Sequence, residues 1–330
     1  MSSTEPDKPT ILILGSKKDA NIKLLANHLE RRDDCKHAIL DYQNSTFAFE
    51  MSADGEFTLV VEGTTIAGPI AIFDRVLLLK RTEYYPSGEE SEADFVADEY
   101  RALFNLLAEL YGAKVVNSLS SRRCLVKPYQ QRAAALAGFL VPETIISNQK
   151  SALVRFSDRT DDHLIIKPLA NGMLYPNDPG GPAATAILTN RIARSDLVSA
   201  ADDDLEYSPS FLQREIPKLY ELRVVYVNGQ IFAFRIESQT YARSETDWRR
   251  MSHKLGYIPC TLEHDTDDKI RIFMNIIGFN LGSLDIVVDN SANLWFLECN
   301  NQGVWAWLDA EVDGAITNAI ANYLIELARS

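Results

Sequence analysis

The sequence lacks three features that mark large classes of protein. It has four cysteines in 330 residues and no C-x-x-C pair, so neither a disulfide framework nor a zinc site is indicated. It has no uninterrupted apolar run of about 18 residues, so we expect no membrane-spanning helix. It also lacks a basic excess, because 46 acidic residues outnumber 33 lysines and arginines and give a net charge of −13. Nucleic acids and anionic membranes bind basic surfaces, so we expect neither as a partner.

The composition is otherwise that of a globular protein. Hydrophobic residues make up 46% of the chain, and its length suggests two domains or one large α/β domain with subdomains. Residues 1–10 are polar and lack the apolar segment of a signal peptide. We therefore expect a cytoplasmic protein.

The hydrophobic pattern predicts an α/β protein that becomes α+β in its central and C-terminal parts. A buried strand over 11–14 leads into a helix over 19–32, which is typical of an open α/β layer. Further on, Asn228-Gly229 predicts a hairpin between strands 222–227 and 230–237. Two strands over 283–288 and 294–298 and a helix over 314–328 follow. We expect three units: an N-terminal α/β domain over 1–119, a central small-sheet domain over 120–212, and a C-terminal domain over 213–330.

Three oxygen-bearing side chains lie near the C-terminal strands. Glu298 and Asn300 are two residues apart, so they share one face of a strand. Asp285 joins them if its strand pairs antiparallel with theirs. Two carboxylates and an amide form the hard donor set that Mg²⁺ prefers. The alternative is that Asp285 is merely a hydrogen-bonded strand residue, although an unpaired carboxylate within an apolar strand is costly.

Two lysines have unusual neighbours. Lys167 ends a buried-looking strand before a glycine- and proline-rich loop over 171–182, and Lys127 opens a helix. A lysine beside such a loop suits a phosphate group, although most lysines are solvated surface residues. The loop matches neither a Walker P-loop nor a G-x-G-x-x-G dinucleotide site.

The segment from Gln213 to Pro217 is a strand that a proline stops. Its unpaired backbone groups could bind the edge of an adenine, with Glu215 accepting from the exocyclic amine; an interdomain linker is the alternative. Arg223 and Arg235 lie on the two arms of the predicted hairpin, where they are either surface cations or clamps on a charged transition state. Trp248-Arg249 lies in a polar loop and suggests a ligand contact.

In combination, these segments resemble the ATP-grasp superfamily over nearly the whole chain. More narrowly, the sequence is similar to the microviridin-type ATP-grasp ligases, which macrocyclise ribosomally made precursor peptides. The narrower match rests on Lys-Pro-Tyr-Gln-Gln from residue 127, Pro-Glu-Thr-Ile-Ile-Ser-Asn from 142, Asp-Trp-Arg from 247 and Asn-Gln-Gly-Val-Trp-Ala-Trp from 301. It departs from the usual Glu-x-Asn-Pro-x-Gly pattern, since Asn301 replaces the proline and Cys299 separates the two ligands.

The resemblance implies an ATP-grasp fold with a C-terminal metal-binding sheet, and it implies roles for individual residues. ATP and two Mg²⁺ ions would be the cofactors. Asp285, Glu298 and Asn300 would bind the metal, and Arg223, Arg249 and Arg235 would be catalytic. The nucleotide would be held by Lys127, Lys167, Gln213, Glu215, Ile216, Lys218 and Glu221.

The resemblance also implies a reaction and its partners. A side-chain carboxylate of a precursor peptide, which carries a leader and a core, would be activated as an acyl phosphate. A hydroxyl or amine of the same peptide would then close an ω-ester or ω-amide ring. We expect a homodimer. Two alternatives stay open: an ATP-grasp ligase that joins separate substrates, as glutamate-adding ligases do, and a non-catalytic nucleotide-binding protein.

Overall fold

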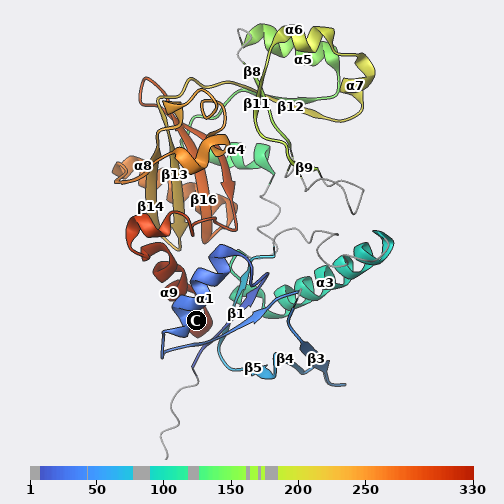
Figure 1. Cartoon of the computed structure of the whole chain (residues 1–330), viewed down its shortest axis with the longest axis vertical. Coiled ribbons are helices and arrows are strands. Elements are labelled where there is room, and N and C mark those ends of the chain that lie inside the picture. Colours follow the sequence, from blue (N-terminus) through green and yellow to red (C-terminus); the bar gives the residue numbers. More distant parts are fainter. Residues whose placement is uncertain are drawn as a thin grey trace, which may run out of the picture.

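The computed structural model describes residues 8–42, 44–76, 90–117, 126–160, 164–169, 172–174 and 185–330. The expected boundary between residues 119 and 120 and most of the expected loop over 171–182 lie outside these ranges. Within them, no helix is long and apolar enough to cross a bilayer. The described elements form two three-stranded sheets, one four-stranded sheet, one five-stranded sheet and a short two-stranded pair (Figure 1).

The N-terminal part is an open parallel layer, as its sequence predicts. Its sheet has the order β2-β1-β6, with β1 (Thr10–Leu14) fully buried between β2 (Lys36–Leu40) and β6 (Ile70–Asp74). Asp19 begins α1 (Ala20–Glu30) by accepting hydrogen bonds from the Asn21 and Ile22 amides. Strands β3 (Phe47–Met51), β4 (Phe57–Val61) and β5 (Thr64–Ile66) form a separate antiparallel sheet. Helix α3 (Glu90–Tyr111) follows, and a 3₁₀ turn (Gly112–Lys114) ends it.

The central part is a four-stranded antiparallel sheet with its helices on one side. The strand order is β11-β8-β12-β7, and the bounds are β7 (Thr144–Ser147), β8 (Leu164–Ile166), β11 (Asn190–Ile192) and β12 (Ser210–Arg214). Leu164 and Leu212 pack with Leu153 and Phe156 of α5 (Lys150–Arg159), a helix that the sequence pattern did not reveal. The remaining elements are α6 (Arg194–Ser199), α7 (Asp202–Glu206) and the paired β9 (Met173–Leu174) and β10 (Thr185–Ala186).

The C-terminal part is a five-stranded antiparallel sheet in the order β15-β14-β13-β16-β17. Its predicted hairpin is confirmed, with Asn228 and Gly229 at positive φ between β13 (Tyr220–Val227) and β14 (Gln230–Ile236). The other strands are β15 (Tyr257–Cys260), β16 (Leu281–Val288) and β17 (Leu294–Asn300). Strand β15 lies in a segment expected to be a loop. Three 3₁₀ helices, η3 (Ser238–Thr240), η4 (Trp248–Lys254) and η5 (Asp309–Val312), complete the connections.

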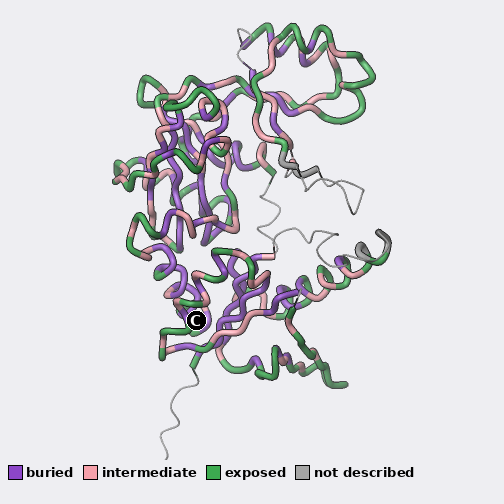
Figure 2. Tube along the Cα trace, viewed as in Figure 1, coloured by how far each residue is buried: buried purple, intermediate pink, exposed green. Residues whose placement is uncertain are grey.

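Each face of this sheet has its own core (Figure 2). On one face, Leu222 and Val224 pack with Phe273 of α8 (His264–Ile277) and with Ala133 of α4 (Lys127–Leu136). On the other, Val225 packs with α9 (Ala315–Arg329), whose buried side also contacts the N-terminal sheet. Helix α9 therefore joins the N-terminal and C-terminal sheets into one core.

Arg75 ties the N-terminal sheet to the segment that follows β17. The side chain is 2% exposed, and its Nε lies 3.1 Å from Oδ1 of Asp19. Its Nη1 donates to the carbonyls of Gln302 and Gly303 at 2.7 and 2.8 Å. Burial raises the pKa of Asp19, but the charge and hydrogen bond of Arg75 outweigh it and hold the pKa below its usual range. One buried cation thus satisfies a helix-capping carboxylate and a turn from the far end of the chain.

Replacing Arg75 with methionine tests this connection. The change leaves Asp19 and two carbonyls without their cation, so we expect the free energy of unfolding to fall by about 3–5 kcal/mol. Urea denaturation measures it. Lys17→Met, which breaks an exposed ion pair with Glu62, is the control and should cost less than about 1 kcal/mol. Equal losses in the two variants would contradict the role given to Arg75.

Candidate functional site

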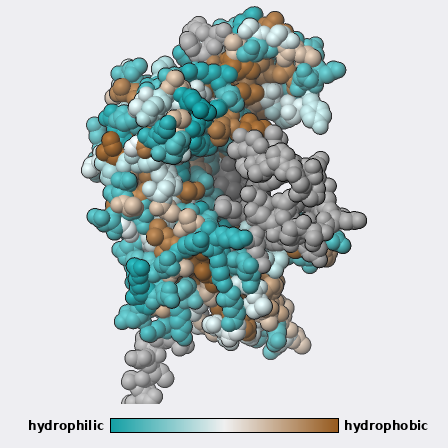
Figure 3. All heavy atoms as spheres, viewed as in Figure 1, coloured by the Kyte–Doolittle hydropathy of each residue, from teal (hydrophilic) through white to brown (hydrophobic). Residues whose placement is uncertain are grey.

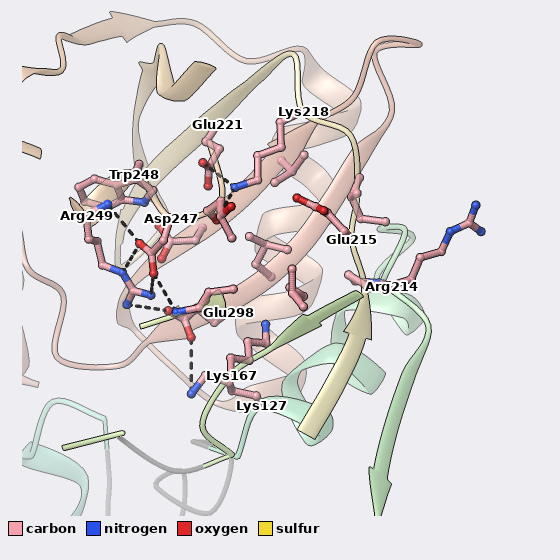
Figure 4. Close-up of a pocket in the computed structure, with 18 of the residues that line it drawn as sticks. Lys127, Lys167, Arg214, Glu215, Lys218, Glu221, Asp247, Trp248, Arg249 and Glu298 are labelled. Carbon is pink, nitrogen blue, oxygen red and sulfur yellow. Dashed lines mark hydrogen bonds and ion pairs between the residues drawn. The ribbon is translucent and has the colours of Figure 1, made fainter. Parts of the chain in front are cut away.

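A pocket opens between the central and C-terminal sheets (Figure 4). Its empty volume is about 870 Å³ including the open mouth. On the face shown in Figure 3 the surface is mostly hydrophilic, and hydrophobic side chains gather where the central lobe meets the rest. Nine of the residues assigned from the sequence line the pocket: Lys127, Lys167, Glu215, Ile216, Lys218, Glu221, Arg249, Asp285 and Glu298.

The two carboxylates face each other across neighbouring strands. Strands β16 and β17 pair antiparallel, which is the condition for Asp285 to join the other two side chains, and Asp285 lies directly opposite Glu298. A register shift follows, because Ile286 pairs with Phe296 and leaves Leu297 as the extra residue. Phe296 packs in the core on the opposite face, so regular alternation would direct Glu298 into that core. The bulge at Leu297 therefore brings Glu298 to the pocket.

Cations surround this carboxylate pair. Nη1 of Arg223 donates to Oδ1 of Asp285 at 2.9 Å, and Glu298 lies 3.7 Å from Lys127 and 3.8 Å from Arg249. Burial raises the pKa of Glu298, but Lys127, Lys167 and Arg249 outweigh it and lower the pKa overall. Burial raises the pKa of Asp285 above its usual range in spite of Arg223, and the charge of Glu298 adds to the rise. The surrounding cations therefore favour the ionised form of Glu298, whereas burial and the charge of Glu298 disfavour the ionised form of Asp285.

The donor set suits Mg²⁺. Asn300 pairs with Ser283 one step along the same face, and its Oδ1 accepts the amide of Gln302 at 3.0 Å. Among the described residues, no three His, Cys, Asp or Glu side chains form a metal-binding group. Magnesium commonly uses one or two carboxylates and takes its other ligands from water and phosphates. Two carboxylates and an amide, all hard oxygen donors on one face, fit that pattern.

The two lysines reach the pocket from different parts of the fold. Lys167 follows β8 and is 9% exposed, and burial lowers its pKa to about 8. Lys127 begins α4, where Pro128 occupies the first turn. Gln130, one turn on, exchanges two hydrogen bonds with the backbone of Cys299, at 2.8 and 2.9 Å. That bond pair fixes the helix beside the strand that bears Glu298, so it sets the distance from Lys127 to the carboxylate.

An unpaired backbone edge crosses the pocket wall. Strand β12 ends at Arg214, and Glu215 and Ile216 form no backbone hydrogen bond with another described residue. Both line the pocket, and Glu215 is paired with Arg191 at 2.7 Å. Gln213 is fully buried behind this edge, donates to Thr144 at 2.8 Å and leaves its Oε1 without a partner among the described residues. The edge can offer a planar ligand two amide and two carbonyl groups.

Lys218 and Glu221 form a buried ion pair in the wall of the pocket. Their Nζ and Oε1 atoms are 3.0 Å apart, and Glu221 is 3% exposed. Burial raises the pKa of Glu221 in spite of Lys218.

Arg249 extends over the pocket from η4. Asp247 binds its guanidinium at 2.8 and 2.6 Å. Burial lowers the pKa of Arg249, but Asp247 outweighs it and raises the pKa overall. The charge of Arg249 is therefore fixed in place toward Glu298.

Four assigned residues do not line the pocket. Arg223 supports Asp285 from behind, Asn300 lies beyond Glu298, and Gln213 is buried. Arg235 pairs with Leu222 and stacks on Tyr220, so it lies on the opposite face of the sheet from Arg223. The geometry therefore gives no support to a catalytic role for Arg235.

Sequence reasoning assigned no role to Gln130 or Asp247, although both lie within the motifs that carry the resemblance. Gln130 and Asp247 touch the assigned side chains or their strand. Asp247 could have been found, because an Asx residue two positions before an arginine in a polar loop is a common turn cap. Gln130 carries no such signal, since its partner is a backbone 169 residues away.

No family profile and no curated protein match the chain. Solved structures do. A RiPP-associated ATP-grasp ligase from Chryseobacterium gregarium, in complex with ADP and a leader and core peptide, is 23% identical with a TM-score of 0.79, over 96% of this chain and 97% of that one. The macrocyclase MdnC from Microcystis aeruginosa MRC, bound with precursor peptide MdnA, is 21% identical with a TM-score of 0.78, over 96% and 99%. The ATP-grasp ligase PsnB, complexed with minimal precursor, Mg and ADP, is 20% identical with a TM-score of 0.73, over 98% and 100%.

These matches extend over nearly the full length of both chains, and they agree with the observed order of an open α/β layer, a small central sheet and a five-stranded sheet. The expected fold is confirmed: the chain has the ATP-grasp fold.

Proposed function

We propose that this chain is an ATP- and Mg²⁺-dependent ligase that macrocyclises a ribosomally made precursor peptide. In this proposal it phosphorylates Asp or Glu side chains of the peptide, forms ADP, and closes rings with Ser or Thr hydroxyls or a Lys amine. The peptide's leader and core, ATP and a second copy of the chain are the proposed partners.

One observation carries the proposal. Two lysines from different parts of the fold and one loop arginine converge on a carboxylate that faces a second carboxylate, at one end of a pocket. Lys127, Lys167 and Arg249 supply the positive charge that a triphosphate needs, and Asp285 and Glu298 supply metal ligands. The unpaired edge at Glu215 and Ile216 lies in the same pocket, where it would take the adenine. Lys218, Glu221 and Gln213 would complete the nucleotide site.

The metal would be held by Asp285, Glu298 and Asn300, and two ions would fit the charge of a triphosphate. When bound, magnesium supplies charge neutralisation to the phosphate groups during transfer. Arg223 keeps Asp285 in place, and Arg249 faces the region where the transferred phosphoryl group would lie.

The chemistry needs no protein nucleophile. A peptide carboxylate oxygen attacks the terminal phosphorus of ATP, the bond to ADP breaks, and an acyl phosphate forms. A hydroxyl or amine of the same peptide then attacks the acyl carbon, loses its proton and releases phosphate. Each ring therefore costs the peptide one water. Positioning and cationic neutralisation can account for most of the acceleration of such transfers.

Mass spectrometry of a peptide incubated with the enzyme, ATP and Mg²⁺ tests the proposal. Peptides encoded beside the gene and bearing repeated Thr or Ser with Asp or Glu are the first substrates to try. We expect loss of one water per ring with one ADP formed. A gain in mass would show that the enzyme joins separate substrates instead, and nucleotide binding without ADP formation under any acceptor would show a non-catalytic protein.

Lys167→Ala should weaken the use of ATP. The ammonium is buried and directed into the pocket, and one charge-assisted hydrogen bond is worth about 1.5–3 kcal/mol, so we expect the KM for ATP to rise about 10- to 100-fold. Steady-state ADP formation measures it. Lys150→Ala removes a lysine paired with Asp202 away from the pocket and should leave the KM unchanged. An unchanged KM in Lys167→Ala would remove that residue from the phosphate site.

Glu298→Gln should separate metal use from nucleotide binding. The variant keeps the shape of the side chain and removes its charge, so we expect ADP formation to fall at least about 100-fold. Nucleotide without metal should bind as well as before or better, because Lys127, Lys167 and Arg249 are no longer neutralised by the carboxylate. Glu237→Gln, which changes an exposed pair with Arg235, is the control. Normal turnover in Glu298→Gln would contradict the metal assignment.

A further inference from the structure

A short segment after β14 is bonded to both sheets that form the pocket. Residues 245–250, which we call the clasp segment, supply four lining residues: Thr246, Asp247, Trp248 and Arg249. Figure 4 shows Asp247, Trp248 and Arg249 together on one side of the pocket, with Glu298 beside Arg249. The segment lies within a polar loop, residues 238–263, to which the sequence assigned no helix or strand.

Four contacts join the clasp segment to the central sheet. Nη2 of Arg250 donates to the carbonyl of Thr189 at 2.8 Å and to Oδ1 of Asn190, at the start of β11, at 2.7 Å. The amide of Thr189 donates in return to Oδ2 of Asp247 at 3.3 Å. Arg191 lies between Glu215 and Glu245, at 2.7 and 3.4 Å. Two of these links meet at Thr189: the guanidinium of Arg250 binds its carbonyl, and the carboxylate of Asp247 binds its amide. The links are therefore specific.

Two contacts hold the same segment to the C-terminal sheet. Nζ of Lys218, just before β13, donates to the carbonyl of Thr246 at 3.0 Å, and Gln239 donates to the carbonyl of Glu245 at 3.4 Å. Lys218 also pairs with Glu221. The clasp segment therefore spans the gap between two sheets that no common strand joins.

Asp247 connects these links to the pocket. Its carboxylate is 3% exposed and accepts the amide of Thr189 on one side and the guanidinium of Arg249 on the other. A shift of β11 relative to the C-terminal sheet would move Asp247, and with it the arginine that lies 3.8 Å from Glu298. Arg250 makes two of the contacts that oppose such a shift, yet it does not line the pocket.

We propose that Arg250 is a positioning residue, which fixes the clasp segment to β11 and thereby holds Arg249 over the pocket. The inference deepens the proposed function, on which it rests, by naming what sets the geometry of that arginine. Within the described part of the chain, Arg250 makes no hydrogen bond or ion pair with the candidate metal ligands and does not itself line the pocket, although its partner Thr189 does. Loss of the Arg250 side chain leaves the nucleotide contacts in place but lets Arg249 move. The loss therefore lowers turnover more than it weakens nucleotide binding.

Three variants and two measurements test it. Arg250→Ala removes both contacts, Arg250→Lys keeps one donor, and Arg243→Ala changes an exposed arginine of the same loop as the control. Amide hydrogen exchange in the nucleotide-free protein reports the clasp directly, because the Thr189 amide is bonded to Asp247. Steady-state ADP formation gives kcat and the KM for ATP.

For Arg250→Ala we expect faster exchange at 187–192 and 244–252, kcat lower by about tenfold and a KM for ATP changed by less than about threefold. Arg250→Lys should recover part of both effects, and Arg243→Ala should match the wild type. Unchanged exchange at 187–192, or a loss confined to KM, would overturn the proposal. If the wild type forms no ADP, the proposed function fails, and the exchange result still decides whether Arg250 holds the clasp segment.

Discussion

The site depends on two like charges that are held side by side. Asp285 and Glu298 are a directly opposed pair on β16 and β17, where like charges repel and where both side chains are largely removed from water. The protein supports this arrangement with four cations from four different segments: Arg223, Lys127, Lys167 and Arg249. A strand, a helix start, the end of a second sheet and a loop must therefore meet at one place. The ATP-grasp fold brings them together.

Most of the supporting contacts join a side chain to the backbone of a residue that is far away in the sequence. Gln130 holds α4 against Cys299, Arg75 holds the turn at Gln302 and Gly303, and Asn117 binds the backbone of Leu281 and Asn301. Each contact lies within a few residues of β16 or β17. A buried polar group is costly unless it is paired, so each interaction also specifies which segment lies against which. The carboxylate pair is thus fixed at the end of the two strands where β16 begins and β17 ends.

Much of the fold around the site could be predicted from the sequence, because the patterns that specify it lie within short segments of the chain. The pattern at Asn228-Gly229 fixes a hairpin, strand alternation places Glu298 and Asn300 on one face, and the hydrophobic run over 11–14 gives the buried strand that begins the α/β layer. The sequence left open whether β16 and β17 pair antiparallel, and the structure shows that they do. The assigned roles of the site residues stay predictions.

What the sequence did not reveal depends on contacts between distant segments. The bulge at Leu297, which turns Glu298 toward Asp285, arises from pairing with another strand and leaves no local signal. Strand β15 is short, at the edge of its sheet and interrupted by Pro259, so its pattern resembled a loop. Arg235 was grouped with Arg223 because both lie on one hairpin, but the register puts them on opposite faces.

The claim that most needs a direct test is that Asp285 and Glu298 gather a divalent cation beside a nucleotide. Anomalous diffraction from crystals grown with Mn²⁺ and a non-hydrolysable ATP analogue measures it. The account predicts a manganese peak within bonding distance of both carboxylates, with Glu298 released from Lys127 and Arg249. A peak elsewhere, or bound nucleotide with both carboxylates still held only by their present cations, would contradict it.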